Sequence, residues 1–354
     1  MKGAFGSLYL TLAWFMANEI IDHDGVILEK NKAAAFNTYL DAMESYEFMD
    51  THHSMESRAN LVSLHPARRE YIRALYSLED GKPVIRSNSD FRLILQDILA
   101  QIVPDWSGKT LRATSQPLAR LTRELMENAD LWARTDTTGS IYARGVRAIT
   151  LRLVDIDDKN RSKFCGSNPS LNTYLQSMLL QKQSAWTGTS EGGRTGRNFI
   201  ELTIIDSGPG LARRWLASHP DGRSDPTSLD GISLEDEAKA VAKCFQKWGT
   251  SSHDVDRGIG LFAVAKLLRE RNGFMRLRTG RLAYFFGTDN AVKNFQERSD
   301  KSGGTASGYA LLDDGTHIFK NEGKVEFFLS PWGEAPLAAL EGTTYSILLP
   351  VQGA

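Results

Sequence analysis

One acidic side chain, Asp206, stands where an apolar run of residues meets a cluster of glycines. The run from Leu202 to Ile205 is apolar and β-branched, which is typical of a buried strand. Gly208 and Gly210 follow at once, and glycine lets the backbone approach a flat ligand closely. A carboxylate at the mouth of a strand is then placed to accept hydrogen bonds from that ligand. An ordinary strand and tight turn would look the same, so the motif needs support from elsewhere.

A second pair of polar side chains, Glu124 and Asn128, lies in a segment with helical periodicity. We expect the helix to start at Ser115-Gln116-Pro117, where a capping hydroxyl precedes a proline. Residues four apart lie one above the other on the same side of a helix. Mg2+ takes few protein oxygens and leaves room for water and phosphate, which suits this pair. A solvated helix face is the simpler alternative.

A third feature is the glycine-rich stretch from Gly249 to Leu261, which leads into an apolar helical segment ending at Arg271. The first turn of a helix presents free N–H groups and the positive end of the helix dipole. This arrangement predicts a binding site for a polyphosphate. A glycine-rich turn before a packing helix remains the alternative reading of the same residues.

Four motifs occur in order along the chain, and together they resemble those of the GHKL superfamily of ATP-binding domains. The superfamily is named for gyrase, heat-shock chaperone, histidine kinase and mismatch-repair ATPase. The resemblance covers residues 110 to 352 and implies a Bergerat fold. This is an α/β (α+β) two-layer sandwich, with a mixed, largely antiparallel sheet on one side and helices on the other. The motifs are Glu124-Leu-Met-Glu-Asn128-Ala, Asp206-Ser-Gly208-Pro-Gly210, Arg257-Gly258-Ile-Gly260-Leu261 and Gly342-Thr343-Thr.

The resemblance also implies a role for each motif residue. Asn128 would hold Mg2+ at the phosphates of ATP, and Glu124 would position or deprotonate the attacking water. Asp206 would accept a hydrogen bond from the adenine amino group, with Thr343 supporting it. A mobile lid at about residues 211–257 would close over the nucleotide. The remaining contacts to base and phosphates would come from Gly208, Gly210, Thr250, Ser251, Arg257, Gly258, Gly260 and Leu261.

The composition is that of an ordinary globular protein, with 24% charged and 41% hydrophobic residues among 354. A formal net charge of -1 provides no basic field for nucleic acid. Two cysteines far apart in sequence predict neither a disulfide framework nor a metal site, and favour a cytoplasmic location. We interpret the apolar segment 4–17 as a core helix rather than a signal peptide. No run approaches the roughly 18 apolar residues of a membrane helix.

The chain is expected to have two domains. Residues 1–110 read as a mainly helical domain of unknown role, and residues 111–354 as the ATP-binding domain. Two insertions are expected, at about 160–198 and 287–341. We predict strands at 148–155, 199–206, 275–279, 282–286 and 342–350, and helices at 30–49, 67–78, 90–102, 171–186, 234–248 and 261–271.

Three functions remain open. The first is Mg2+-dependent ATP hydrolysis, with lid closure acting as a switch for a homodimer or a partner protein. Glu124 favours it, because a carboxylate at this place can act as a general base. The second is a protein kinase that passes the γ-phosphate to a His or Ser of a partner. No histidine lies in a sensor-kinase box, but small serine kinases of the superfamily also carry the glutamate. The third is a nucleotide-gated scaffold without turnover.

One departure from the superfamily concerns the γ-phosphate. In the gyrase and mismatch-repair branches, a domain that follows the ATP-binding domain donates a lysine to this phosphate. The resemblance extends to residue 352 of this sequence, so we expect any such lysine to come from elsewhere. The candidate sources are the N-terminal domain, a second subunit or another protein.

Overall fold

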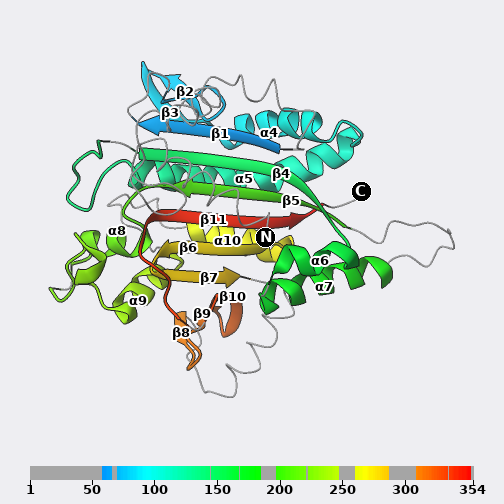
Figure 1. Cartoon of the computed structure of the whole chain (residues 1–354). Helices are drawn as coiled ribbons and strands as arrows, with labels where there is room; N and C mark the ends of the chain where they lie inside the picture. The colour runs from blue at the N-terminus through cyan, green and yellow to red at the C-terminus, as the bar shows by residue number, and fades with distance from the viewer. Residues whose placement is uncertain are drawn as a thin grey trace, which may run out of the picture.

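A computed structural model describes residues 58–65, 70–143, 145–166, 168–184, 197–220, 222–246, 260–286, 308–333 and 335–351. The helices expected within 4–17 and 30–49 lie outside these residues. The described chain forms one large sheet with helices packed against it (Figure 1). The strands of this sheet are β1 (Arg58–His65), β4 (Gly145–Ile156), β5 (Arg197–Asp206), β6 (Phe274–Gly280), β7 (Leu282–Phe286), β8 (Gly308–Leu311), β9 (His317–Asn321), β10 (Lys324–Pro331) and β11 (Leu340–Pro350).

The sheet has nine strands in the order β1-β4-β5-β11-β6-β7-β10-β9-β8. Every neighbouring pair in it is antiparallel. The expectation of a largely antiparallel sheet is therefore confirmed, but its description as mixed is wrong for the described strands. The last strand, β11, enters the middle of the sheet and runs opposite to both β5 and β6. Its central place brings Thr343 beside the end of β5.

One face of the sheet carries most of the helices. These are α4 (Asn88–Ile102), α5 (Gly108–Trp132), α8 (Leu211–Ser218), α9 (Leu234–Cys244) and α10 (Gly260–Glu270). Side chains alternate between the two faces along a strand, so Ile347 and Leu349 join the core under these helices. Leu348 points the other way, into a smaller cluster under α6 (Asp158–Cys165) and α7 (Pro169–Ser184).

Helices α8 and α9 lie at one end of the central strands, and α6 and α7 lie at the other (Figure 1). Helix α8 begins near the end of β5. Most sequence-predicted elements after residue 145 are confirmed within a few residues, including the β6–β7 pair. The predicted helix 234–248 ends earlier, at Cys244.

Two predicted helices are corrected. Residues 67–78 do not form a helix where they are described: turns lead into β2 (Tyr76–Glu79), which pairs with β3 (Lys82–Ile85). Helix α5 begins at Gly108, about two turns before the predicted start. The Ser107 side chain caps it by accepting a hydrogen bond from the Thr110 amide, and Pro117 lies inside the helix. The Ser-Gln-Pro signal was misleading because Ser107 supplies the cap first.

The described part of residues 1–110 is not mainly helical and does not stand apart. Strand β1 pairs with β4 over eight residues and so belongs to the main sheet. Leu61 of β1 and Leu99 of α4 share one hydrophobic core with α5. A domain boundary near residue 110 is therefore not found among the described residues, because the segment completes the sheet edge and the helix layer.

The expected insertions and lid are built into the fold where they are described. Helices α6 and α7 come from the first insertion, while β8, β9 and β10 from the second extend the sheet. The described residues between 211 and 246 form α8, a 3-10 turn (Leu229–Gly231) and α9. Leu216 of α8 and Phe245, which follows α9, are buried in the main core. This part of the expected lid is thus an integral part of the helix layer. Residues 247–257 lie outside the described chain.

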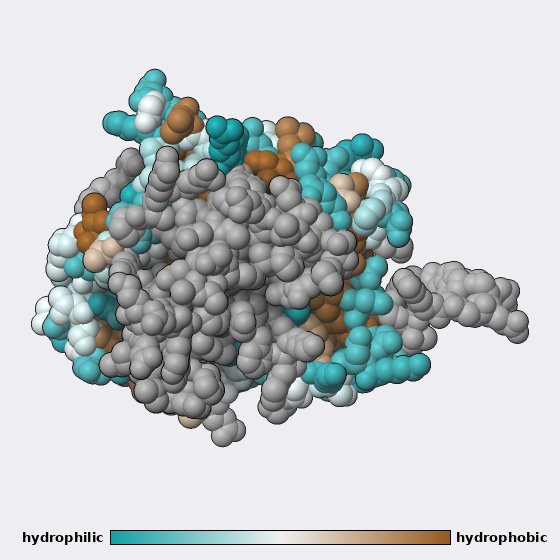
Figure 2. Space-filling model, turned by 45° about the horizontal axis from the view of Figure 1, so that its top comes forward, coloured by the Kyte–Doolittle hydropathy of each residue, from teal (hydrophilic) through white to brown (hydrophobic). Residues whose placement is uncertain are grey.

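The visible surface of the described residues is mainly hydrophilic, with separate hydrophobic spots (Figure 2). In the described residues, no helix combines the length and the apolar character needed to cross a membrane.

Candidate functional site

A row of four polar residues crosses the sheet at the end of β5. Arg147 of β4 and Thr343 of β11 lie directly opposite Asp206, one on each side. Thr279 of β6 lies opposite Thr343 and extends the row. All four share the face that the helices cover, because Asp206 follows the buried Ile204 at the period of two. The row therefore lies between the sheet and the helix layer.

The carboxyl group of Asp206 is held by two backbone amides. The N–H of Gly208 donates to Oδ1 over 3.0 Å, and the N–H of Thr343 donates to the same oxygen over 3.2 Å. Burial raises the pKa of this carboxyl to about 7, although both amides and the nearby arginines act in the opposite direction. One oxygen, Oδ1, is thus fixed by backbone amides, and no described residue donates to the other, Oδ2.

The glycines around Asp206 are required by close backbone approaches. A Cβ atom on Gly208 would lie 2.5 Å from Cα of Ala133, at the C-terminal end of α5. Gly210 has a φ of +81°, and the next amide, that of Leu211, donates to Oγ1 of Thr279 over 3.0 Å. These contacts lock the loop after β5 against α5 and β6. The sequence anticipated the close approach but not its partners.

Gly342 makes the tightest of these approaches. It has a φ of +92°, and a Cβ atom there would lie 1.9 Å from the carbonyl oxygen of Asp206. Only glycine lets β11 cross so close to the end of β5. This crossing places the Thr343 amide against the Asp206 carboxylate, and so explains why the Gly342-Thr343 motif accompanies Asp206.

Glu124 and Asn128 face the start of α10. A Cβ atom on Gly260 would lie 3.1 Å from Oε2 of Glu124 and 3.8 Å from Nδ2 of Asn128. The two motifs, more than 130 positions apart, therefore meet at the N-terminus of a helix. Burial raises the pKa of Glu124, and the Arg123 guanidinium, 3.8 Å away, partly opposes this. Leu261, the next residue of α10, is buried in the core and anchors the helix end.

Helix α5 joins the two groups of residues. It carries Glu124 and Asn128 near α10, and its end at Ala133 contacts Gly208 beside Asp206. With a rise of about 1.5 Å per residue, Glu124 and Ala133 are roughly 13 Å apart along the helix. The structure thus brings Glu124 and Asn128 together with Gly260 and Leu261 at the start of α10, and it places Asp206, Gly208, Gly210 and Thr343 together near the C-terminal end of α5. Thr250, Ser251, Arg257 and Gly258 lie outside the described residues and stay predictions.

Two residues of the row were missed from the sequence. Thr279 ends a strand that was correctly predicted, and its alternation with Leu277 could have placed it on the helix-covered face. Arg147 lies just before the predicted strand 148–155, and its burial could not be read from a charged residue at a strand end. Only the register of the sheet identifies both as neighbours of this site.

The fit of a nucleotide and a metal ion can be judged from the same residues. The open Oδ2 of Asp206 suits a hydrogen-bond donor such as an amino group on a base. Among the described residues no group of three or more His, Cys, Asp or Glu could hold a metal ion. A Mg2+ ion held by one amide oxygen and by phosphate needs no such group, and Asn128 can supply that oxygen.

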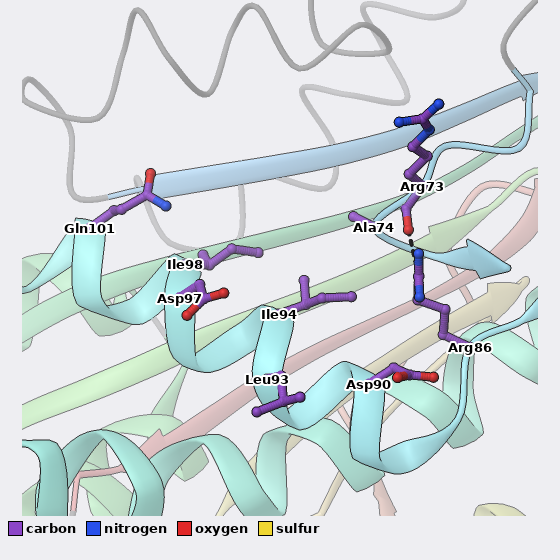
Figure 3. Close-up of a pocket in the computed structure, with 9 residues that line it drawn as sticks. All are labelled: Arg73, Ala74, Arg86, Asp90, Leu93, Ile94, Asp97, Ile98 and Gln101. Carbon is purple, nitrogen blue, oxygen red and sulfur yellow. Dashed lines mark hydrogen bonds between the residues drawn. The ribbon is translucent and has the colours of Figure 1, made fainter.

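A separate groove lies between α4 and the segment from Arg73 to Arg86 (Figure 3). It has a volume of about 520 Å3 and is open to solvent. Within the Arg73–Arg86 wall, the Nε of Arg86 donates to the Arg73 carbonyl oxygen over 2.5 Å. None of the site residues lines this groove, which is lined by Arg73, Ala74, Arg86, Asp90, Leu93, Ile94, Asp97, Ile98 and Gln101.

Comparison with known proteins gives no match: no family model, no curated protein and no solved structure is significantly similar to this chain. The functional argument therefore depends on the site residues themselves.

Proposed function

We propose that this chain binds Mg2+-ATP at the site along α5 and hydrolyses it. The observation that carries the proposal is the meeting of Glu124, Asn128 and Gly260 at the N-terminus of α10. A carboxylate, an amide and a helix start are groups suited to an attacking water, Mg2+ and phosphate, respectively. We further propose that the antiparallel sheet, with most of its helices on one face, is a Bergerat fold.

The base of ATP would bind at Asp206. Its open Oδ2 accepts a hydrogen bond from the adenine amino group, while the Gly208 and Thr343 amides fix the position of Oδ1. Adenine offers a donor at the position where guanine has a carbonyl oxygen. Oδ2 and a guanine carbonyl would repel each other while the carboxylate is charged, so the site prefers adenine.

The phosphates would lie at the start of α10. The first-turn N–H groups of this helix and the positive end of its dipole favour negative charge. Asn128 would hold Mg2+, which neutralises phosphate charge when it is bound. Gly260 leaves the space beside Glu124 open, because any larger residue would place a Cβ atom 3.1 Å from its carboxylate.

Glu124 would act as the general base. Its carboxylate accepts a proton from a water molecule as that water attacks the γ-phosphorus, and the bond to the β-phosphate oxygen breaks to release ADP and phosphate. The raised pKa of Glu124 makes it a better proton acceptor than an exposed glutamate. We propose that the bound nucleotide state is passed to a partner protein or to a second copy of the chain.

Two alternative functions use the same site. In a protein kinase, a His or Ser of a partner would take the place of the attacking water at Glu124. In a nucleotide-gated scaffold, ATP would bind without turnover. We favour hydrolysis, because Glu124 is half-buried beside Asn128 and its described salt bridge, to Arg123, is long at 3.8 Å and leaves the carboxylate able to take up a proton.

Incubation with Mg2+ and γ-labelled ATP separates these functions. Release of label as free phosphate by the wild-type chain, but not by Glu124→Ala, would support hydrolysis. Transfer of label to an added protein would support the kinase. Binding of ATP with no release or transfer of label would support the scaffold, and absence of binding would overturn the proposed function altogether.

A further inference from the structure

The neighbour of Asp206 on β4, Arg147, is the most buried charged side chain of the polar row, at 2% exposure. Its Nη2 donates to Oε1 of Glu70 over 2.8 Å, and its Nε donates to the hydroxyl of Tyr76 over 3.2 Å. The same Nε lies 3.4 Å from Oδ1 of Asp130 on α5. The guanidinium is thus engaged by Glu70, Tyr76 and Asp130, and it forms no salt bridge with Asp206.

These groups form a connected network. The Tyr76 hydroxyl donates to Oδ1 of Asp130 over 2.9 Å, so it joins Arg147 to α5. Glu70 also contacts Nδ1 of His65 at 2.7 Å and Nε of Arg134 at 3.3 Å. Removal of one partner from a buried ionic cluster leaves a charge without compensation, and this is costly.

Asp206 is the nearest alternative partner for Arg147 by strand register. Directly opposite residues on antiparallel strands have Cβ atoms about 4.5–5.5 Å apart, well within the reach of an arginine side chain. No described residue donates to Oδ2 of Asp206, and a guanidinium pairs readily with a carboxylate. An Arg147 that turned to Asp206 would occupy the oxygen on which the base is proposed to bind.

We propose that Glu70 and Tyr76 are positioning residues of the nucleotide site, which hold Arg147 away from Asp206 and so keep Oδ2 open for the base. This inference rests on the proposed function. Both residues precede α4, in the segment that was expected to form a separate domain. A partner or conformational change that moved this segment would close the base site by releasing Arg147 to Asp206.

The double variant Glu70→Gln/Tyr76→Phe tests the proposal. We expect its affinity for Mg2+-ATP to fall by about ten- to a hundredfold, because the acceptor oxygen becomes engaged by Arg147. Addition of Arg147→Met should return the affinity to the wild-type range. Removal of an uncompensated buried charge also relieves a purely structural defect, so the rescue supports the proposal only together with the Asp206 titration described next. Tyr71→Phe, beside Glu70 and stacked edge-on against Tyr76, is the matched control and should bind like wild type.

A carboxyl NMR titration without nucleotide gives an independent readout. In the double variant the pKa of Asp206 should fall by about 1–3 units as Arg147 pairs with it. It should rise again in the triple variant. Wild-type affinity in the double variant, or no recovery in a folded triple variant, would overturn the inference. If no variant binds ATP but the NMR shifts occur, then the proposed function fails while the movement of Arg147 stands.

Discussion

Gly260 and Glu124 come from different motifs, yet a Cβ atom on Gly260 would lie only 3.1 Å from Oε2 of Glu124. This separation is tighter than ordinary van der Waals contact, so a side chain at Gly260 would displace the carboxylate. The relationship makes the glycine part of the shape of the site, beyond its place at the start of α10.

Gly260→Ala should therefore lower ATP turnover while the fold is retained. Alanine is a better helix former than glycine, so the free energy of unfolding should be unchanged or slightly higher. The added methyl group shifts the Glu124 carboxylate by a few tenths of an ångström, so turnover should fall by about three- to tenfold. Steady-state phosphate release checks this prediction. Gly333→Ala, where a Cβ atom meets no atom within 4 Å, is the control. Equal effects of both changes would contradict it.

Asp206→Asn should weaken ATP binding but stabilise the free protein. The amide keeps the size and the Oδ1 acceptor of Asp206 but loses the charged acceptor of the base, which is worth about 1.5–3 kcal/mol. ATP affinity should fall by about one to two orders of magnitude, whereas GTP affinity should not fall, because the charge that repels the guanine carbonyl is removed. Titration calorimetry measures both, with Asp225→Asn, an exposed turn residue, as the control. If Asp206→Asn bound ATP as tightly as the wild type, Asp206 would not be the residue that contacts the base.

The same substitution predicts a pH-dependent change in stability. The folded-state pKa of Asp206, about 7, lies above the ordinary value of 3.8, so the folded state holds this proton more tightly than the unfolded chain. The stability that this tighter proton binding contributes is fully present below pH 4 and is lost as the pH rises through about 7. Asp206→Asn should remove this loss, and raise the free energy of unfolding by about 2–4 kcal/mol at pH 8. Thermal unfolding at pH 5 and pH 8 should show the gain mainly at pH 8.

ATP affinity itself should depend on pH through Asp206. Only the charged carboxylate is a full acceptor for the adenine amino group, and its pKa in the free protein is about 7. Affinity should then be nearly constant above pH 8 and fall by about tenfold between pH 8 and pH 6. In Asp206→Asn this slope should be absent. A slope of equal size in the variant would assign it to another group.

Much of the fold was predictable because its signals are local. The apolar β-branched run before Asp206 and the helical spacing after Gly260 are both confirmed as β5 and α10. The segment 67–78 was predicted wrongly because local periodicity suggested a helix, whereas Tyr76 forms a strand and bonds to Asp130 through its hydroxyl. In this segment the strand pairing and the Tyr76–Asp130 hydrogen bond therefore outweigh the local helical preference.

The site was predictable only in part, for the same reason. Glu124 and Asn128 could be paired from their spacing, and Asp206 from the glycines that follow it. Their placement along α5 depends on Gly208 against Ala133 and on the central position of β11. Strand order and register are set by packing over the whole chain, and so Arg147 and Thr279 could not be assigned to the site beforehand.

Asn128→Ala should remove the Mg2+-dependent part of ATP binding and leave the metal-free part. If the Asn128 amide oxygen holds Mg2+, the variant should lose the tightening of ATP binding that Mg2+ gives, and keep the weaker metal-free binding. Calorimetric titrations with Mg2+ and with a chelator measure the difference. Asn160→Ala, at a helix start far along the chain, is the control. An equal loss of affinity with and without Mg2+ would make Asn128 a structural residue of α5.

Glu124→Ala should separate binding from hydrolysis. The carboxylate is proposed to face the attacking water rather than the nucleotide, so affinity for Mg2+-ATP should stay near that of wild type. Turnover should fall by about two to four orders of magnitude, the usual contribution of a positioned general base. Single-turnover hydrolysis and calorimetry on the same preparation measure both quantities.

Glu127→Ala is the matched control for Glu124→Ala. Glu127 is one turn of chain away on the same helix, carries the same charge and pairs with Arg123 at 3.2 Å. Removal of either glutamate changes the local charge equally, but only Glu124 lies against Gly260. A loss of turnover in Glu124→Ala alone would then come from the carboxylate at the start of α10. Equal losses in both variants would point to the local charge, and lost ATP binding in Glu124→Ala would place this residue among the ligands of the metal or phosphate.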